Sequence, residues 1–321
     1  MTEEANISNF SNDSGNGEFL LSQKNEVLSR RHFLKGKTIG VSISESDNLD
    51  ELGYSVSHLK DAIIEIARYI LASGGRLAYG GDMRQGGFTE LIFDLLVYYK
   101  ADKELQPYER FESYLYYPIS TTLSMEREAA LRQNVTFKRV APPADLHLVN
   151  TNEFLKADSP QNLYVWARCL TKMREEIEAA CHARVFIGGR IKGFKGKCPG
   201  ILEELLTAIK YQHPIYLVGA FGGITKDAIE ALSGQSPNSF SNEYYMDNVD
   251  YKDMSLIFNE KHPDNLIDYK DYLSRLQQIG LKGISNNNGL SELDNLRLTT
   301  TPHISEIVYL ILKGMANCFT K

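Results

Sequence analysis

The sequence predicts an α/β protein with a doubly wound, mostly parallel sheet and a helical extension at its C-terminal end. Two observations predict this class. Short runs rich in β-branched and aromatic residues alternate with segments of about 10–15 residues that show helical periodicity, and this alternation is typical of βαβ units. Three of the predicted strands also end in glycines, and sheets of this kind bind ligands at the carboxyl ends of their strands.

The predicted strands are Lys37–Ser44, Arg76–Gly81, Glu112–Ser120, Val135–Pro143, Ala183–Gly189 and Pro214–Gly223. The first is a β-branched run of the kind found in a buried strand. The glycine-rich ends are Gly80–Gly81, Gly188–Gly189 and Gly222–Gly223. Because parallel strands end at one edge of a sheet, these glycines are expected to converge on a ligand, as they do in a Rossmann-like fold.

The predicted helices follow a spacing of three and four residues. In the clearest one the apolar positions are Leu59, Ala62, Ile63, Ile66, Ala67, Ile70 and Leu71, and Gly74–Gly75 closes the helix. Further helices are predicted at residues 90–99, 125–132, 162–180 and 225–232, and one begins at Pro199.

The chain divides into three predicted regions. Residues 1–18 are polar and rich in Asn, Ser and Gly, which predicts a disordered tail. Residues 19–235 form the predicted Rossmann-like core. Residues 236–321 form a helical extension with helices at 266–280 and 303–315, separated by a turn over residues 285–296. The second of these helices is almost wholly apolar, so we expect it to pack on the core or on a partner subunit.

Composition excludes several function classes. A net charge of −6 argues against a nucleic-acid binder that relies on a broad basic face. No apolar run approaches the roughly 20 residues of a membrane span. The four cysteines and seven histidines show no metal-ligand spacing, which predicts reduced thiols, a cytoplasmic protein, and neither a metal nor a cofactor.

The segment GGRIKGFKGKCPGILEELL, residues 188–206, carries the strongest local signal. It is not a Walker A loop, because Ile191 occupies the position of the required glycine and Cys198 that of the hydroxyl residue. Pro199 and Gly200 nevertheless open a helix whose free N–H groups favour an anion. Basic side chains precede it, among them Arg190 and Lys197. The segment therefore predicts a phosphate site, with a solvated linker as the alternative.

Charged residues on two helices are further candidates. Arg174 lies near the centre of an apolar helix stripe, where a charge is costly unless something pairs with it. It either forms an internal salt bridge, with Glu203 or Glu204 as the partner, or points into the ligand pocket. The two glutamates fall in a first helical turn, where the helix dipole alone favours carboxylates. Periodicity does not separate them.

The remaining candidates are the hydroxyl residues and glycines at the strand ends. Ser42 and Ser44 end the first strand and are suited to contact a phosphate or a ribose. The full set of strand-end candidates is Ser42, Ser44, Gly80, Gly81, Asp82, Arg84, Gly86, Gly87, Gly188, Gly189, Gly222 and Gly223.

The segments LTKMREEIEAACHARVFIGG and GKCPGILEELLTAI resemble the core of the SLOG superfamily. This superfamily includes the LOG-type phosphoribohydrolases, which activate cytokinins, and the DprA/Smf proteins. LOG enzymes carry an arginine-lysine helix, a strand that ends in Pro-Gly-Gly, and then Gly-Thr-x-x-Glu. By this resemblance Arg174 matches the helix arginine, Gly188–Gly189 the glycine pair, and Gly200 with Glu204 the last element. RLAYGGDMRQGG, residues 76–87, is similar to the upstream glycine turn.

Two departures bear on catalysis. Ten residues, Arg190 to Pro199, separate elements that are nearly contiguous in LOG enzymes, and Ile201 replaces the phosphate-binding threonine. The C-terminal residues are similar to those of prokaryotic SLOG proteins from conflict systems, where such domains accompany TIR or sirtuin-like effectors. The resemblance covers roughly residues 37–235 well and the tail more loosely.

Two functions follow from these observations. The favoured one is a sensing module for a nucleotide or nucleotide-derived ligand, including NAD-derived ones, in signalling or antiviral defence. It would form a homo-oligomer and act through an effector protein partner. The alternative is an enzyme that hydrolyses an N-glycosidic bond of a nucleotide, in which Arg174 and Glu204 are the catalytic residues.

Overall fold

The computed structural model describes residues 32–81, 86–98 and 109–320. Within them a six-stranded sheet, parallel throughout, has the order β4-β3-β2-β1-β5-β6. The strands are β1 Thr38–Ser44, β2 Arg76–Tyr79, β3 Phe111–Tyr116, β4 Thr136–Val140, β5 Ala183–Gly188 and β6 Ile215–Val218. The predicted doubly wound, Rossmann-like class is thus confirmed.

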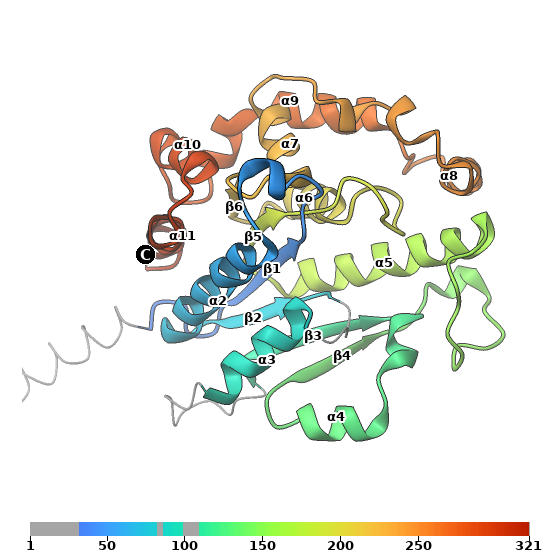
Figure 1. Ribbon diagram of the computed structural model, residues 1–321, viewed down its shortest axis with the longest axis horizontal. Helices are drawn as coiled ribbons and strands as arrows, with labels where there is room; N and C mark the ends of the chain where they lie inside the picture. Colours follow the sequence, from blue (N-terminus) through green and yellow to red (C-terminus); the bar gives the residue numbers. More distant parts are fainter. Residues whose placement is uncertain (1–31, 82–85, 99–108, 321) are drawn as a thin grey trace, which may run out of the picture.

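Helices cover both faces of the sheet (Figure 1). One face packs against α2 Val56–Ala72 and α3 Phe88–Tyr98, and the other against α5 Pro160–Ala180, α6 Gly200–Lys210 and α7 Gly223–Leu232. A short helix, α4 Met125–Leu131, joins β3 to β4. All seven apolar positions that predicted α2 are buried in its packing on the sheet, and Gly74 follows the helix with a positive φ of 81°.

The chain reverses its direction of winding between β1 and β5. From β1 it runs outward through β2 and β3 to β4 at one edge, and α5 then returns it to β5, which pairs with β1. Ser44 at the end of β1 lies opposite Gly188 at the end of β5. In open α/β sheets this topological switch point is where ligands bind.

The C-terminal residues form four helices that pack on the rest of the chain, α8 Val249–Lys261, α9 Tyr269–Ser285, α10 Glu292–Thr300 and α11 Ile304–Phe319. Helix α11 buries Ile307, Leu310 and Ile311 in the same core as α2 and leaves Tyr309 61% exposed. Helices α8 and α9 share a second core with α6 and α7. Among the described residues, no helix is both long enough and apolar enough to cross a membrane.

Several elements differ from the predictions. The predicted turn over residues 285–296 is wrong in its second half, because Ser291 accepts a hydrogen bond from the Asp294 N–H and starts α10. Helix α8 was not predicted. The strands expected at 112–120 and 214–223 end at Tyr116 and Val218, before a 3-10 turn and a glycine turn respectively.

Candidate functional site

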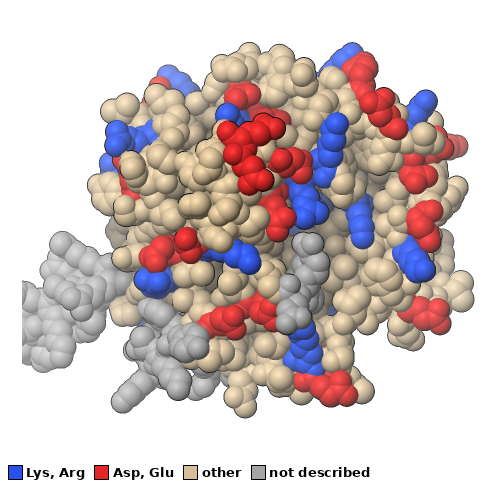
Figure 2. Space-filling view, in the orientation of Figure 1, with Lys and Arg blue, Asp and Glu red and all other residues tan. Residues whose placement is uncertain are grey.

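A cavity of about 400 Å³ lies at the carboxyl ends of β1, β2 and β3. Helix α5, the start of α6 and the loop between β5 and α6 complete its walls. The face shown in Figure 2 carries acidic and basic side chains next to one another rather than a field of one sign. That mixture suits a small ligand better than a nucleic-acid backbone, which requires an extended basic surface.

The structure brings eight of the predicted residues together in this cavity. They are Ser42, Ser44, Gly80, Gly81, Arg174, Arg190, Gly200 and Glu204. Other candidates lie outside the cavity lining: Gly86, Gly87, Gly188, Gly189, Lys197, Pro199, Glu203, Gly222 and Gly223. Asp82 and Arg84 are outside the described residues. Strand-end residues of β1 and β2 therefore meet at one cavity, as expected for a parallel sheet, while the remaining candidates lie outside its lining.

The glycines after β5 have a packing role in the structure. Gly188 has a φ of 65°, and a Cβ atom there would lie 2.6 Å from the carbonyl oxygen of Ser44. A Cβ on Gly189, at φ 104°, would lie 2.7–2.8 Å from the side chains of Ile201 and Ile224. These glycines let the end of β5 sit tightly against β1, α6 and α7.

Four buried charges and the partly buried Glu204 form an alternating row beside the cavity. The guanidinium of Arg184 lies 2.6 Å from Glu178 Oε1 and 2.6 Å from Glu204 Oε2. Glu204 Oε1 is 3.5 Å from Arg174 Nε, and Arg174 forms a short ion pair with Glu203. Each charge thus faces at least one opposite charge, which is the condition under which ions are tolerated in an interior.

Arg174 combines the two roles that the sequence left open. It is only 6% exposed and pairs with Glu203, yet it also lines the cavity. Glycines make room for its guanidinium, because a Cβ on Gly200 would lie 2.8 Å from Nη2 and one on Gly196 would lie 3.1 Å from Nη1. Burial opposes its charge, but the attraction of Glu203 and then Glu204 outweighs burial and raises the pKa of Arg174.

Glu204 is held at the cavity floor by neighbours on β1 and β5. The Ser42 hydroxyl donates to Glu204 Oε2 at 2.5 Å, and Arg184 Nη2 lies 2.5 Å from the same Ser42 oxygen. The Arg184 side chain itself passes under Gly40, where a Cβ atom would approach its Cδ to 2.5 Å. The orientation of Glu204 is therefore fixed by buried partners.

Burial also affects the pKa of Glu178, which lies at the end of this row of charges. It raises the pKa of Glu178 to about 7, although the neighbouring Arg184 acts in the opposite direction. Burial opposes the charge of Arg184 as well, but Glu178 and Glu204 outweigh it, and the pKa of Arg184 is raised.

The sequence interpretation missed an aromatic wall of the cavity. Its members come from β2, α3, β3, α5 and the β5–α6 loop, namely Tyr79, Phe88, Tyr116, Trp166 and Phe194. Trp166 is buried and apolar, and periodicity alone does not distinguish a core residue from one that also lines a cavity. Lys195 Nζ lies 4.2 Å from the centre of the Trp166 ring, within the range of a cation–π contact.

The start of α6 also lines the cavity. No side chain caps this helix terminus, so the first-turn N–H groups have no side-chain acceptor and favour an anion. The ten-residue loop Arg190–Pro199 adds Arg190 and Lys195 to the same cavity. Among the residues that the structure describes, Lys195 forms no ion pair, whereas Arg190 pairs with Glu45 at 3.3 Å.

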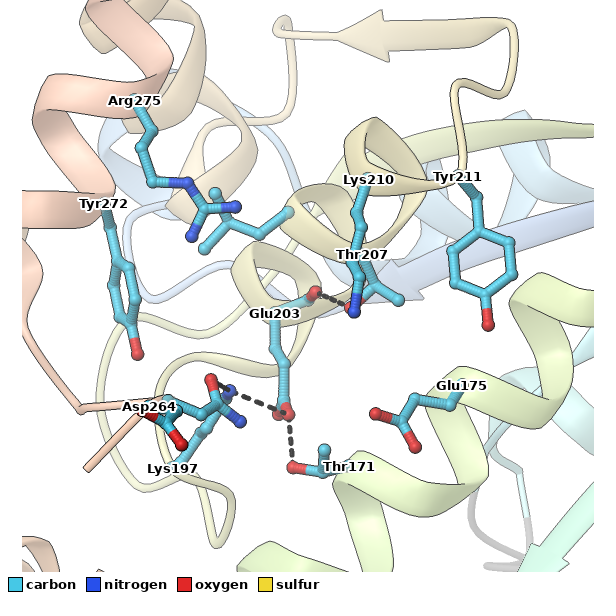
Figure 3. A pocket seen from close by; sticks show the side chains of 12 residues that line it. Thr171, Glu175, Lys197, Glu203, Thr207, Lys210, Tyr211, Asp264, Tyr272 and Arg275 are labelled. Carbon is cyan, nitrogen blue, oxygen red and sulfur yellow. Dashed lines mark hydrogen bonds and ion pairs between the residues drawn. The ribbon is translucent and has the colours of Figure 1, made fainter. Parts of the chain in front are cut away.

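Lys197 and Glu203, both assigned to the ligand pocket from sequence, line a different cavity. It has a volume of about 350 Å³ and lies between α5, α6 and the start of α9 (Figure 3). Glu203 accepts a hydrogen bond from the Thr171 hydroxyl there and holds Arg174 through its other oxygen. Glu203 therefore connects the two cavities, because it lines the second and holds Arg174, which lines the first.

Cys169 and Cys181 are buried, and His182 accepts a backbone hydrogen bond. In the described part of the chain no His, Cys, Asp and Glu side chains group in the way that a metal site requires. Burial raises the pKa of Cys169 and of Cys181 to about 12, so both thiols stay protonated at neutral pH. His182 Nδ1 accepts the Thr38 N–H at 3.2 Å, as expected for a packing residue.

Comparison with known proteins identifies the family. A family model described as SLOG cluster2 matches residues 33–298 of this chain. The match extends from the start of β1 through the sheet and on into α10. No curated protein matches the sequence.

Proposed function

This chain belongs to the SLOG cluster2 family, and on that premise we propose that it binds a nucleotide or nucleotide-derived ligand in the cavity at the strand ends. The family is a nucleotide-related group of Rossmann-like domains, as the sequence resemblance implied. The ligand is assigned to the cavity at the strand ends, and the protein is assigned a sensing role.

A single observation carries the proposal, which is that one cavity combines aromatic side chains with groups that attract an anion. Tyr116 and Trp166 can stack on a base. The uncapped start of α6, together with Arg190 and Lys195, suits a phosphate. A nucleotide has the same two parts, and a volume of about 400 Å³ falls in the usual range of ligand sites.

Sensing is favoured over hydrolysis because of the state of Glu204. Its Oε2 atom accepts from Ser42 and pairs with Arg184, and its side chain is 13% exposed. A carboxylate with these partners is committed to hydrogen bonds and ion pairs, whereas a general acid must give up a proton to a leaving group. On this proposal the protein holds the ligand without turning it over. The protein forms an oligomer, and the binding event is passed to an effector partner in signalling or antiviral defence.

One observation favours the alternative of N-glycoside hydrolysis. Arg174 and Glu204, which match the LOG residues, do lie side by side on the cavity wall, with Nε and Oε1 3.5 Å apart. In that case Arg174 would hold the sugar phosphate and Glu204 would assist departure of the base.

The experiment that separates the two functions uses nucleoside monophosphates and NAD-type dinucleotides. Binding is measured by calorimetry, and base release is followed by chromatography on the same samples. We expect saturable binding without base release, and we expect Ser44→Ala to weaken that binding while Lys252→Gln, which changes an exposed residue outside both cavities, leaves it unchanged. Base release that Glu204→Gln abolishes would establish the hydrolase, and an absence of binding to the whole panel would refute both.

A further inference from the structure

The second cavity contains a nearly buried ammonium group. Lys197 is 8% exposed, and its backbone carbonyl is fixed by the Tyr251 hydroxyl at 2.6 Å. An ammonium has three hydrogens to donate, and among the described residues its hydrogen-bond acceptor is Asn265 Oδ1 at 3.0 Å. Its Nζ atom also lies 5.8 Å from the centre of the Phe258 ring, and the side chain lines the cavity.

The nearest carboxylate does not neutralise this ammonium fully. Glu203 Oε1 lies 4.0 Å from Lys197 Nζ and already accepts the Thr171 hydroxyl. The other Glu203 oxygen is paired with Arg174. Glu203 is therefore shared between the two cations, and Lys197, which lines the cavity, has the longer of its two ion pairs.

Two more cations line the same space from other elements. Lys210 is in the last turn of α6 and forms no ion pair among the described residues, and Arg275 extends from α9. Figure 3 shows Lys197, Lys210 and Arg275 reaching the cavity from three parts of the chain. Arg275 has only a partly exposed contact with Asp271 at 3.7 Å. Three separate cations around one cavity suit an anionic group.

Acidic side chains at the same cavity limit the kind of anion. Glu175 on α5 and Asp264 before α9 also line it. They oppose a large polyanion, but each can accept hydrogen bonds from hydroxyl groups. The hydroxyls of Thr171 and Thr207 complete a lining rich in donors and acceptors.

We propose that the second cavity binds a small hydroxylated oxyanion, a phosphate ester or a carboxylate, with its charged group against Lys197. Lys210 and Arg275 approach the anion from the rim, and Glu175 and Asp264 accept its hydroxyl groups. This site is separate from the nucleotide cavity and does not depend on the function proposed for it.

Calorimetry on the full chain tests the proposal with two probes, glycerol 3-phosphate and glycerate, which distinguish the phosphate ester from the carboxylate. Saturable binding of at least one probe is expected. Lys197→Gln should weaken it about tenfold, because a charge-assisted hydrogen bond is lost. Lys210→Gln and Arg275→Gln should each weaken it about threefold, since exposed charges contribute less. These rim variants keep the test valid if Lys197→Gln lowers stability.

Two controls locate the binding. Lys252→Gln removes an exposed lysine of α8 that lines neither cavity, and it should leave the affinity unchanged. Arg190→Gln alters the first cavity and should also leave it unchanged. The proposal is overturned if neither probe binds at millimolar concentration, or if Arg190→Gln abolishes binding that Lys197→Gln and the rim variants do not affect.

Discussion

Arg184 Nη2 and Glu204 Oε2 lie 2.6 Å apart, and the arginine of this pair is 1% exposed while the glutamate lines the cavity at the strand ends. Arg184 comes from the middle of the sheet and also holds Glu178. A single buried guanidinium therefore pairs with two carboxylates and fixes the one that lines the cavity.

Removing this guanidinium should destabilise the protein strongly. Arg184→Met leaves Glu178 and Glu204 without their common partner, and breaking a buried pair in this way costs about 3–5 kcal/mol of the free energy of unfolding. Urea denaturation measures the loss. The double variant Arg184→Met/Glu178→Gln should recover part of it, because one uncompensated charge has been removed. A change below about 1 kcal/mol in the single variant would contradict the role given to Arg184.

The two lysines of the β5–α6 loop should differ in their effect on nucleotide binding. Lys195 lies over Trp166 and lines the cavity, whereas Lys192 lies over Tyr244 outside it. Lys195→Gln should weaken binding of a nucleoside monophosphate about tenfold, because it removes a cation that no carboxylate neutralises. Lys192→Gln, the matched control, should have little effect in the same calorimetric titration. Equal losses in both variants would indicate a nonspecific charge effect.

His182 should make the free energy of unfolding depend on pH. Burial lowers the pKa of His182 below its ordinary value of 6.5, and its Nδ1 atom accepts the Thr38 N–H. The unfolded chain takes up a proton as the pH falls below 6.5, while the folded chain stays neutral until its lower pKa is reached. The contribution is therefore complete above pH 6.5 and is lost as the pH falls through this interval.

The matched variant for this prediction is His182→Asn, whose side-chain oxygen can accept the same N–H without titrating. The difference in unfolding free energy between wild type and His182→Asn, measured in urea at several pH values, should shift against the wild type as the pH falls below 6.5. A difference that does not vary with pH would show that His182 does not contribute.

Two glycines with positive φ should respond differently to alanine. A Cβ on Gly223, at φ 64°, would lie 2.2 Å from the carbonyl oxygen of Gly189, whereas one on Gly234, at φ 87°, has no atom within 4 Å. Gly223→Ala should lower the unfolding free energy by about 2–4 kcal/mol, because backbone strain adds to a clash with backbone. Gly234→Ala should cost only about 1 kcal/mol. Thermal and urea unfolding of both variants test the ranking.

The fold was predictable because its signal is repeated along the chain. Each βαβ unit alternates an apolar run with a helical stripe, and each predicted strand carries its own evidence for the same class. Ser42 and Gly80 line one cavity because they stand at the carboxyl ends of β1 and β2, which are adjacent parallel strands. Helix α10 was missed because its start depends on Ser291 and Asp294, two polar residues that also suit a turn.

The division of the loop residues between two cavities could not be predicted. Lys195 and Lys197 are two residues apart in a segment without regular structure, where no periodicity tells which way a side chain points. The sequence indicated a local concentration of positive charge. Only the contacts of Lys195 with Trp166 and of Lys197 with Asn265 show that the two lysines line different cavities.

Glu203 and Glu204 are neighbours on α6, and their side chains line different cavities. One consequence concerns the comparison of this chain with distant relatives. An alignment displaced by one position across the β5–α6 loop would match two glutamates that look equivalent in sequence and transfer the role of one to the other. In this family the register of α6 should therefore be set by the residues that its glutamates contact, Arg184 for Glu204 and Thr171 for Glu203, and not by the identity of the acidic pair.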